Sequence, residues 1–256
     1  MSEPKIVLLT GKGDSTSILY HALKNEFLIT AIIQEQPVSK KEFLKKRIKK
    51  LGIVKVTGQI FFQLLIVKFL HLTAAKRKRQ LMENYAMDNS PLPASILIPV
   101  SSVNDERCIK ILQEINPILV IVNGTRIISK KVLDSINAKF INIHAGITPM
   151  YRGVHGAYWA LVNNDPVHCG VTVHLVDPGI DTGAVIDQHL ISISPQDNFV
   201  TYPLLQLGEG ITPLKNAITA IIQNNLVQTK SSGKSRLWSH PGFFQYLYYR
   251  ILKGKK

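Results

Sequence analysis

The sequence predicts an α/β protein in which helices cover both faces of a mostly parallel β-sheet. Short apolar runs of strand length alternate along the chain with amphipathic stretches of helix length, which is the pattern of repeated strand–helix–strand units. The runs are apolar at nearly every position, as in strands that are buried on both faces. With 256 residues, 45% of them hydrophobic, the chain is long enough to bury one sizeable core.

The expected elements follow from these patterns in chain order. The first strand–helix–strand unit comprises 5–11, 15–25 and 27–33. After a basic stretch come a strand at 95–100, a helix at 104–115, a strand at 117–123, a short helix near 129–136 and strands at 138–144 and 170–176. Ligands of such sheets bind at the carboxyl ends of the strands, so polar side chains there are the first candidates for a functional site.

The positive charge of the chain is concentrated in two segments. The net charge is +14, yet residues 40–79 contain thirteen Lys or Arg and one acid, and residues 229–256 contain seven Lys or Arg and no acid. A protein that grips nucleic acid with its whole body would be basic throughout, so this distribution argues against such a partner. We divide the chain into a core domain, 1–228, with an insertion at about 40–90, and a basic aromatic tail, 229–256.

The insertion combines basic with apolar residues. Residues 40–51 predict a basic amphipathic helix, and residues 59–72 form an apolar run interrupted by Gln63 and Lys68. We expect this run to be too short and too polar for a transmembrane span. It suits a membrane interface, with lysines on anionic headgroups, and the aromatic tail has the same character. An anionic membrane surface is therefore an expected partner, and the alternative is a helical hairpin packed on the core or in a homodimer.

Cysteine content and the first residues indicate the compartment. Cys108 and Cys169 are the only cysteines, too few for a disulfide scaffold and not spaced as a metal-binding knuckle. The first residues contain neither a basic leader before an apolar segment nor a small-residue cleavage site. We expect a cytoplasmic protein, held peripherally on the inner face of the membrane.

Polar side chains gather at the ends of two expected strands. Asn142 and His144 are two positions apart at the end of the strand 138–144, so they project from the same face. A glycine-rich turn after the last strand carries Asp177 and Asp181. Asp181, in the middle of the turn, is the better candidate to reach the asparagine and histidine, because Asp177 is expected to cap the backbone of the turn.

These residues belong to a longer ordered pattern. It consists of Asn142-x-His144, Pro149-x-x-Arg152-Gly153 and Asp177-x-Gly179-x-Asp181-Thr182-Gly183, and it resembles the folate-dependent formyltransferases. The resemblance extends over about 95–193, with a weaker match in the first 35 residues. It implies a Rossmann-like formyltransferase fold and an N-formyltransferase that uses 10-formyltetrahydrofolate as formyl donor and no metal. It also implies that Asn142, His144 and Asp181 are catalytic.

The same resemblance indicates a folate site. Residues 123–129, NGTRIIS, are similar to the folate-binding strand end of the family, where backbone groups of Arg126, Ile127 and Ile128 would face the pterin. The loop 176–181 would form the second wall, through Val176, Asp177 and Gly179. One departure concerns the substrate side, because the Ser-Leu-Leu-Pro that usually follows the histidine is here Gly-Ile-Thr-Pro, at 146–149.

Formyl transfer explains why an amide and an imidazole lie side by side. Attack of an amine on a formyl group passes through a tetrahedral intermediate with a negative oxygen, which needs hydrogen-bond donors. The Asn142 amide and a protonated His144 would supply two. Asp181 would keep the imidazole charged and would collect, through a water, the proton that the amine loses.

The acceptor is inferred from residues outside this triad. Gly11 and Gly13 follow the first strand, where backbone N–H groups cradle a phosphate in many proteins, although a tight turn explains them equally well. Arg152 and Gly153 are candidates to contact the substrate. We rank first a small-molecule amine that is phosphorylated or nucleotide-linked, namely an amino sugar on a nucleotide or lipid carrier for surface polysaccharide.

Three alternatives remain. Glycinamide ribonucleotide is one other acceptor of this family. Methionyl-tRNA is a second, although we expect too little chain beyond residue 210 for the barrel-like domain of that enzyme. A different class of function is an inactive formyltransferase-like module that tethers a biosynthetic complex to the membrane. Three further candidate side chains, His155, Trp159 and His174, are expected to be packing residues.

Overall fold

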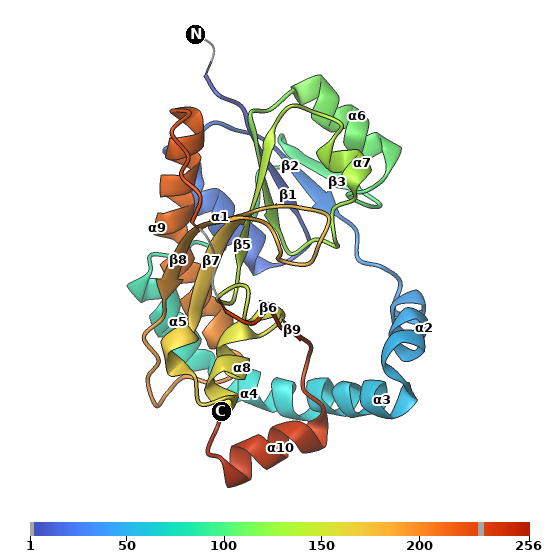
Figure 1. Cartoon of the computed structure of the whole chain (residues 1–256), viewed down its shortest axis with the longest axis vertical. Coiled ribbons are helices and arrows are strands. Elements are labelled where there is room, and N and C mark those ends of the chain that lie inside the picture. Colours follow the sequence, from blue (N-terminus) through green and yellow to red (C-terminus); the bar gives the residue numbers. More distant parts are fainter. Residues whose placement is uncertain (1–2, 230–232) are drawn as a thin grey trace.

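The computed structural model describes residues 3–229 and 233–256, which contain a seven-stranded sheet (Figure 1). Its spatial order is β3 (Leu97–Val100), β2 (Ile29–Glu35), β1 (Ile6–Thr10), β4 (Leu119–Asn123), β5 (Lys139–His144), β7 (Gly170–Leu175) and β8 (Val185–Leu190). The first five strands are parallel, whereas β7 and β8 are antiparallel to their neighbours. The predicted mostly parallel sheet is confirmed.

Alternate residues of the central strand β1 face two different cores. Ile6 and Leu8 pack with α1 (Asp14–Leu23) and α9 (Tyr202–Ile222) on one face of the sheet. Val7 and Leu9 pack with α6 (Glu106–Ile115) and α7 (Lys130–Leu133) on the other face. All four side chains are fully buried, which explains why the run is apolar at every position.

The last strand and the longest helix of the body were not among the predicted elements. Strand β8 reads VIDQHL and has one buried residue, so its sequence lacks the apolar run of the central strands. Helix α9 contains Gly208, Gly210 and Pro213, which normally disfavour a helix interior. Gly208 leaves room for the Tyr85 ring, because a Cβ there would lie 2.5 Å from Tyr85 Cγ. Tertiary contacts therefore outweigh local propensity in this helix.

The insertion leaves the sheet after β2 as α2 (Lys40–Leu51), the predicted basic helix. A turn at Gly52 leads to a second helix, continuous over Ile53–Thr73, which comprises α3 (Ile53–Phe61), a π-helical stretch (Phe62–Val67) and α4 (Lys68–Thr73). By length and composition alone this helix is long and apolar enough to cross a membrane. The expectation that the segment is too short and too polar is wrong by these two criteria, because the helix already begins at Ile53.

One stripe of the helix Ile53–Thr73 is buried against the body. Val56, Phe62 and Leu70 are buried, and the ring of Phe62 lies with its centroid 5.0 Å from those of Phe199 and Tyr246. The tail adds β9 (Leu237–Trp238), which pairs with β6 (Arg152–Gly153), and α10 (Phe243–Leu252), which packs against α3. On this inner side the insertion behaves as the expected packed hairpin.

A buried ion pair fastens the end of the insertion to the body. Arg77, on α5 (Ala75–Asn84), donates from Nε and Nη2 to the two carboxylate oxygens of Asp197 at 2.8 and 2.9 Å. The Asp197 side chain is fully buried and also accepts from the backbone and hydroxyl of Ser194. A buried carboxylate that loses its cation is strongly destabilising, so this pair holds α5 in place.

We expect Arg77→Ala to lower the free energy of unfolding by about 3 kcal/mol, because it leaves the Asp197 charge buried without its partner. Urea unfolding monitored by circular dichroism measures the change. The matched control is Arg79→Ala, which removes the same charge from an exposed position two residues further along α5. Equal destabilisation by both substitutions contradicts a fastening role for the ion pair.

Candidate active site

Strand β5 carries two polar side chains at its carboxyl end. Asn142 and His144 alternate with Ile141 and Ile143, which pack into the core shared with α1 and α9. The two polar side chains therefore lie on the opposite face, and both line one cavity. Across the antiparallel pairing with β7, Asn142 is opposite His174.

The loop after β7 brings Asp181 to His144. Asp181 Oδ2 lies 3.4 Å from His144 Nδ1 and accepts a hydrogen bond from the Gly153 N–H at 2.9 Å. Arg152 Nη1 holds the same loop by donating to the Ile180 carbonyl at 2.9 Å. The backbone φ of Asp181 is +50°, a left-handed conformation that non-glycine residues adopt mainly where function or packing demands it.

Asp177 caps the backbone of its own turn, as the sequence predicted. Its Oδ1 accepts from the Gly179 N–H at 3.0 Å and from the Thr182 hydroxyl at 2.7 Å. It thus caps the turn that presents Asp181, and it lines the cavity together with Val176 and Gly179. The predicted convergence of Asn142, His144 and Asp181 on one open space is present in the structure.

Hydrogen-bond partners define the protonation of the two histidine rings. His144 Nε2 is 2.9 Å from the Tyr151 carbonyl, an acceptor only, so Nε2 carries a hydrogen and Nδ1 faces Asp181. His174 Nδ1 likewise donates to the Leu175 carbonyl at 2.7 Å. His174 Nε2 lies 3.2 Å from the Asn142 amide nitrogen, a contact that orients the amide.

Burial and neighbouring groups shift the pKa values of His144 and Asp181. It lowers the pKa of the His144 imidazole below its usual value, and the opposing attraction of Asp181 does not restore it. Burial disfavours the Asp181 carboxylate, but contacts with His174, His144 and the Gly153 N–H outweigh this effect and lower the pKa of Asp181. Burial and the Asp181 charge therefore act on the pKa of His144 in opposite directions.

His174 was expected to be a packing residue, but it belongs to the site. It is buried, lines the cavity and lies 3.7 Å from an oxygen of Asp181 as well as against Asn142. Its signal in the sequence was a lone histidine in an otherwise apolar strand, which becomes informative only once that strand is paired with β5. His155, in contrast, stacks on Phe199 at 4.1 Å between ring centroids, and Trp159 is buried, as expected for packing residues.

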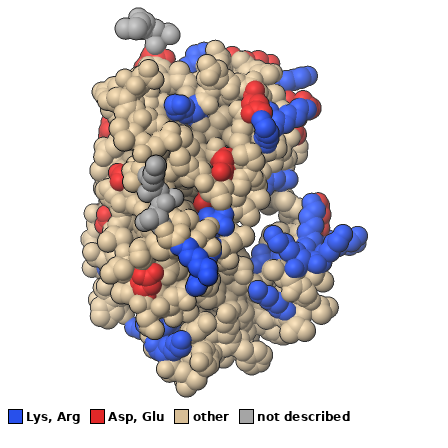
Figure 2. Space-filling view, in the orientation of Figure 1, with Lys and Arg blue, Asp and Glu red and all other residues tan. Residues whose placement is uncertain are grey.

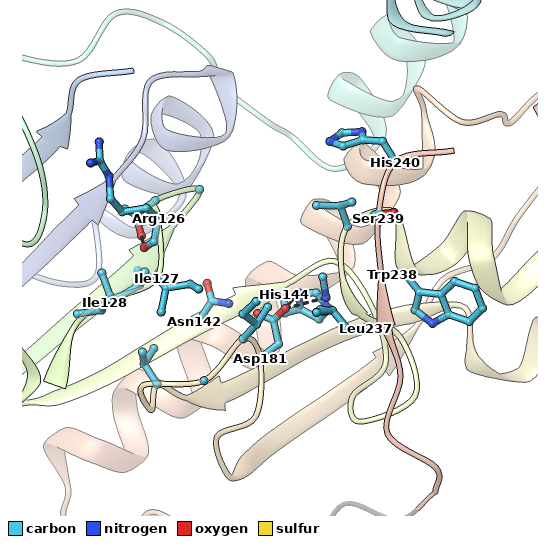
Figure 3. Close-up of a pocket in the computed structure, with 18 of the residues that line it drawn as sticks. Arg126, Ile127, Ile128, Asn142, His144, Asp181, Leu237, Trp238, Ser239 and His240 are labelled. Carbon is cyan, nitrogen blue, oxygen red and sulfur yellow. Dashed lines mark hydrogen bonds and ion pairs between the residues drawn. The ribbon is translucent and has the colours of Figure 1, made fainter. Parts of the chain in front are cut away.

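The cavity has a volume of about 680 Å³, in the size range of small-molecule sites. Figure 3 shows the strand-end loop with Arg126, Ile127 and Ile128 on one side and the tail residues 237–240 on the other, with Asn142, His144 and Asp181 between them. The cavity wall also includes apolar side chains of β4 and of the loop after β7, namely Val122 and Val176.

The predicted folate-binding loop is held by the buried side chain of Glu35. Its Oε2 accepts from the Arg126 backbone N–H at 3.1 Å, and the Arg126 guanidinium forms an ion pair with Oε1 at 2.5 Å. The Ile127 carbonyl accepts from the Asn104 side chain at 2.9 Å. The Arg126 amide and the Ile127 carbonyl are thus engaged within the protein, and Glu35 and Asn104 are positioning residues that the sequence did not single out.

Three of the four predicted substrate residues lie outside the cavity wall. Gly11 and Gly13 are not among the lining residues, and a Cβ on Gly11 would lie 2.3 Å from the Gly124 carbonyl, so close packing explains that glycine. Arg152 orients the Asp181 loop instead of lining the cavity, whereas Gly153 lines it. A substrate role for Gly11, Gly13 and Arg152 has no support from their positions.

The insertion and the tail, for which the sequence predicted a membrane interface or a packed hairpin, also form part of the cavity wall. Arg47, Lys50, Leu51 and Lys55 of the insertion line it, as do residues 237–240 of the tail. Figure 2 shows a hollow between the body and the lysine-rich α2. Gln59 joins the two segments, because its carbonyl accepts from Arg47 at 2.8 Å and its amide donates to the His240 carbonyl at 2.6 Å.

The chemistry available here is that of hydrogen bonding and proton transfer. Asn142 provides a donor, and His144 with Asp181 provides a buried pair that accepts and stabilises a proton. Within residues 3–229 and 233–256, no group of three or more His, Cys, Asp or Glu side chains has the arrangement of a metal site.

A family model described as formyl transferase matches residues 67–203, more than half of the chain. A methionyl-tRNA formyltransferase from Thermodesulfovibrio yellowstonii is 37% identical over 100 residues, which cover 39% of this chain and 32% of that protein. In the first three curated relatives the matched part covers only 32%, 36% and 47% of their length.

Two solved structures share the fold. A sugar N-formyltransferase from a Shewanella species has a TM-score of 0.58 and 17% identity, covering 92% of this chain and 76% of that one. An N-formyltransferase from Helicobacter canadensis, in complex with folinic acid and dTDP-3-aminofucose, has a TM-score of 0.56 and 19% identity, covering 91% and 70%.

We expect Asp181→Asn to lower the pKa of His144 further, because the Asp181 charge is what opposes the effect of burial. Histidine ring resonances followed by NMR over a pH titration measure the change, with His144→Gln to assign the signal. The matched control is Asp187→Asn, whose carboxylate lies 3.4 Å from His189 on β8 and not in this cavity. A His144 pKa that is unchanged or raised in Asp181→Asn contradicts the coupling.

Proposed function

Because the chain belongs to the formyl transferase family, we propose that it transfers a formyl group from 10-formyltetrahydrofolate to a primary amine. The observation that carries the proposal is the contact of His144 with Asp181 at 3.4 Å beside Asn142, in a cavity of small-molecule size. In the sequence this trio also has the order and spacing that resemble the catalytic residues of folate-dependent formyltransferases.

The proposed reaction uses each residue in one role. The amine nitrogen attacks the formyl carbon, and the carbonyl oxygen becomes negative in a tetrahedral intermediate. Asn142 donates from its amide to that oxygen, and His174, on the other side of the amide, keeps it oriented. The proton lost by the amine goes to His144 Nδ1, where Asp181 stabilises the resulting imidazolium. The carbonyl then re-forms as the bond from the formyl carbon to the folate nitrogen breaks, and that nitrogen takes the proton from the His144 imidazolium, which returns the ring to its neutral form.

The shape of the cavity supports a folate as the formyl donor. Ile127, Ile128, Val122 and Val176 offer apolar surface for a flat ring system beside the backbone of the loop 124–128. The Helicobacter canadensis structure, which shares the fold, is a complex with folinic acid. In this proposal Glu35 fixes the loop through Arg126, and the loop 176–181 forms the second wall.

For the acceptor we propose a phosphorylated amine, with an amino sugar on a nucleotide or lipid carrier ranked first. Lys50 and Lys55 line the cavity and are exposed, so their ammonium groups are available to an anionic ligand. Arg47 adds a third cation on the same wall, although its guanidinium is already bound to Gln59. The solved sugar N-formyltransferases share the fold and so support this choice. In this proposal residues 1–228 form the catalytic domain, and the tail 229–256 contributes one wall of its cavity.

We expect turnover of 10-formyltetrahydrofolate in the presence of an amino-sugar nucleotide. In Asn142→Ala we expect kcat to fall by about a hundred- to a thousandfold, because one oxyanion donor is lost. Release of tetrahydrofolate, followed by absorbance, measures the rate. Glycinamide ribonucleotide and methionyl-tRNA are tested in parallel as acceptors. Asn89→Ala, at an exposed position, is the control. Failure of every acceptor rejects enzymatic function, and an unaffected Asn142→Ala rejects the proposed site.

We expect the double variant Lys50→Ala and Lys55→Ala to raise KM for a phosphorylated acceptor by about tenfold or more, with little change in kcat, because uniform electrostatic binding is lost. The matched control is Lys45→Ala with Lys49→Ala, which removes the same charge from exposed positions of α2 outside the cavity wall. Steady-state kinetics at low salt separate KM from kcat. Equal effects of the two double variants indicate steering by net charge and contradict a binding wall.

A further inference from the structure

Two neighbouring helices expose apolar side chains on their outer sides. The helix Ile53–Thr73 and α10 pack against one another at the end of the molecule opposite α6 (Figure 1). We call their exposed apolar side chains the docking face; they are Ile53, Val54, Ile60, Phe61, Leu64, Leu65, Phe69, Leu72, Phe244, Tyr248, Ile251 and Leu252.

The docking face is unlike the outer side of an ordinary surface helix. Such a helix buries one apolar stripe and presents polar residues to water. The helix Ile53–Thr73 buries its stripe, yet Val54 and Leu72 on its outer side are 85% and 79% exposed, and Phe244 of α10 is 80% exposed. Most exposed large hydrophobic side chains of the described residues lie in the insertion and the tail. A concentration of this kind marks an interaction surface.

The charges around the docking face are of one sign. No acid occurs between Glu42 and Glu83, and none occurs in the tail. Lys68 lies among the exposed apolar residues of α4. Lys253 follows α10 directly, with its ammonium 5.4 Å from the centroid of the Tyr249 ring, and both lysines are exposed. Figure 2 shows the blue side chains gathered on α2, beside an end of the molecule that carries few charges. The surface therefore combines apolar contact area with basic flanks.

We propose that the docking face lies on an anionic lipid surface. Its apolar side chains enter the boundary between headgroups and acyl chains, while lysines and arginines contact the headgroups. A second copy of the chain is a poorer occupant, because a symmetric contact would bring two acid-free, basic segments together. A membrane-spanning helix is also disfavoured, since Val56, Gln59 and Phe62 would have to leave their contacts with the body.

Vesicle co-sedimentation tests the proposal and needs no turnover, so its outcome is independent of the proposed reaction. We expect the full chain to bind phosphatidylglycerol-containing vesicles at low salt, to bind phosphatidylcholine vesicles far less, and to retain a salt-resistant part of the affinity. The apolar variant Phe61→Gln, Leu72→Gln and Phe244→Gln should lose at least tenfold in affinity. Each lost basic residue should cost about fivefold, which we test with Lys68→Ala and Lys253→Ala.

Matched controls separate docking from general surface effects. The apolar control is Val167→Gln, Leu190→Gln and Val227→Gln, at exposed positions outside the insertion and tail. The charge control is Lys110→Ala with Lys139→Ala, also at exposed positions. Both controls should bind vesicles like the parent chain. Absence of binding at low salt overturns the proposal, and so does equal loss in a docking variant and its control.

Two further outcomes identify a different occupant. Analytical ultracentrifugation in the absence of lipid shows whether the chain forms a dimer that Phe61→Gln, Leu72→Gln and Phe244→Gln dissociate, which assigns the face to a second copy and overturns lipid docking. Alkaline carbonate washing of the vesicles distinguishes surface binding from insertion. We expect the protein to be released, and retention in the pellet overturns an interfacial arrangement in favour of a spanning helix.

Discussion

The antiparallel pairing of β5 with β7 is the constraint on which the site depends. Strand β5 is parallel to β4 on one side, so its end meets the ends of the other parallel strands, while β7 runs back along its other side. This pairing sets His174 opposite Asn142. Because β7 ends opposite Ile141, its following loop must fold back to bring Asp181 to His144. Because β5 is also held by β4, a slip of this register by one residue would turn His174 of β7 to the other face of the sheet.

The same arrangement sets the electrostatic state of the site. Burial lowers the pKa of His144, and a carboxylate beside Nδ1 favours the charged form of the ring once a proton arrives. Burial disfavours the ionised form of Asp181, and contacts with the Gly153 N–H and the neighbouring histidine rings offset this effect. Several backbone and side-chain contacts thus stabilise the single carboxylate of Asp181. This explains why Arg152 and Gly153 accompany Asp181 in the sequence pattern.

Local patterns were sufficient for the central part of the fold and for the core of the site. The six predicted strands are present, and those at the centre of the sheet, β1 and β4, are apolar runs buried throughout. Asn142 and His144 could be placed because a period of two fixes their common face. The rest depends on contacts between residues distant in sequence. His174 becomes a site residue only through strand pairing, Glu35 only through its contact with Arg126, and Lys50 and Lys55 only through the path of the insertion beside the sheet. Helix α9 was missed because its glycines and proline suit the tertiary packing rather than the helix.

Gln59 links the insertion to the tail, and this link bears on how the chain could have evolved. Its buried amide binds Arg47 of α2 and the carbonyl of His240, a residue 181 positions away. Loss of the tail would leave the Gln59 amide buried without its acceptor, and loss of the insertion would leave the tail without the helix on which it packs. Neither the insertion nor the tail can be gained or lost without disturbing the other. Homologues should therefore contain both segments or neither.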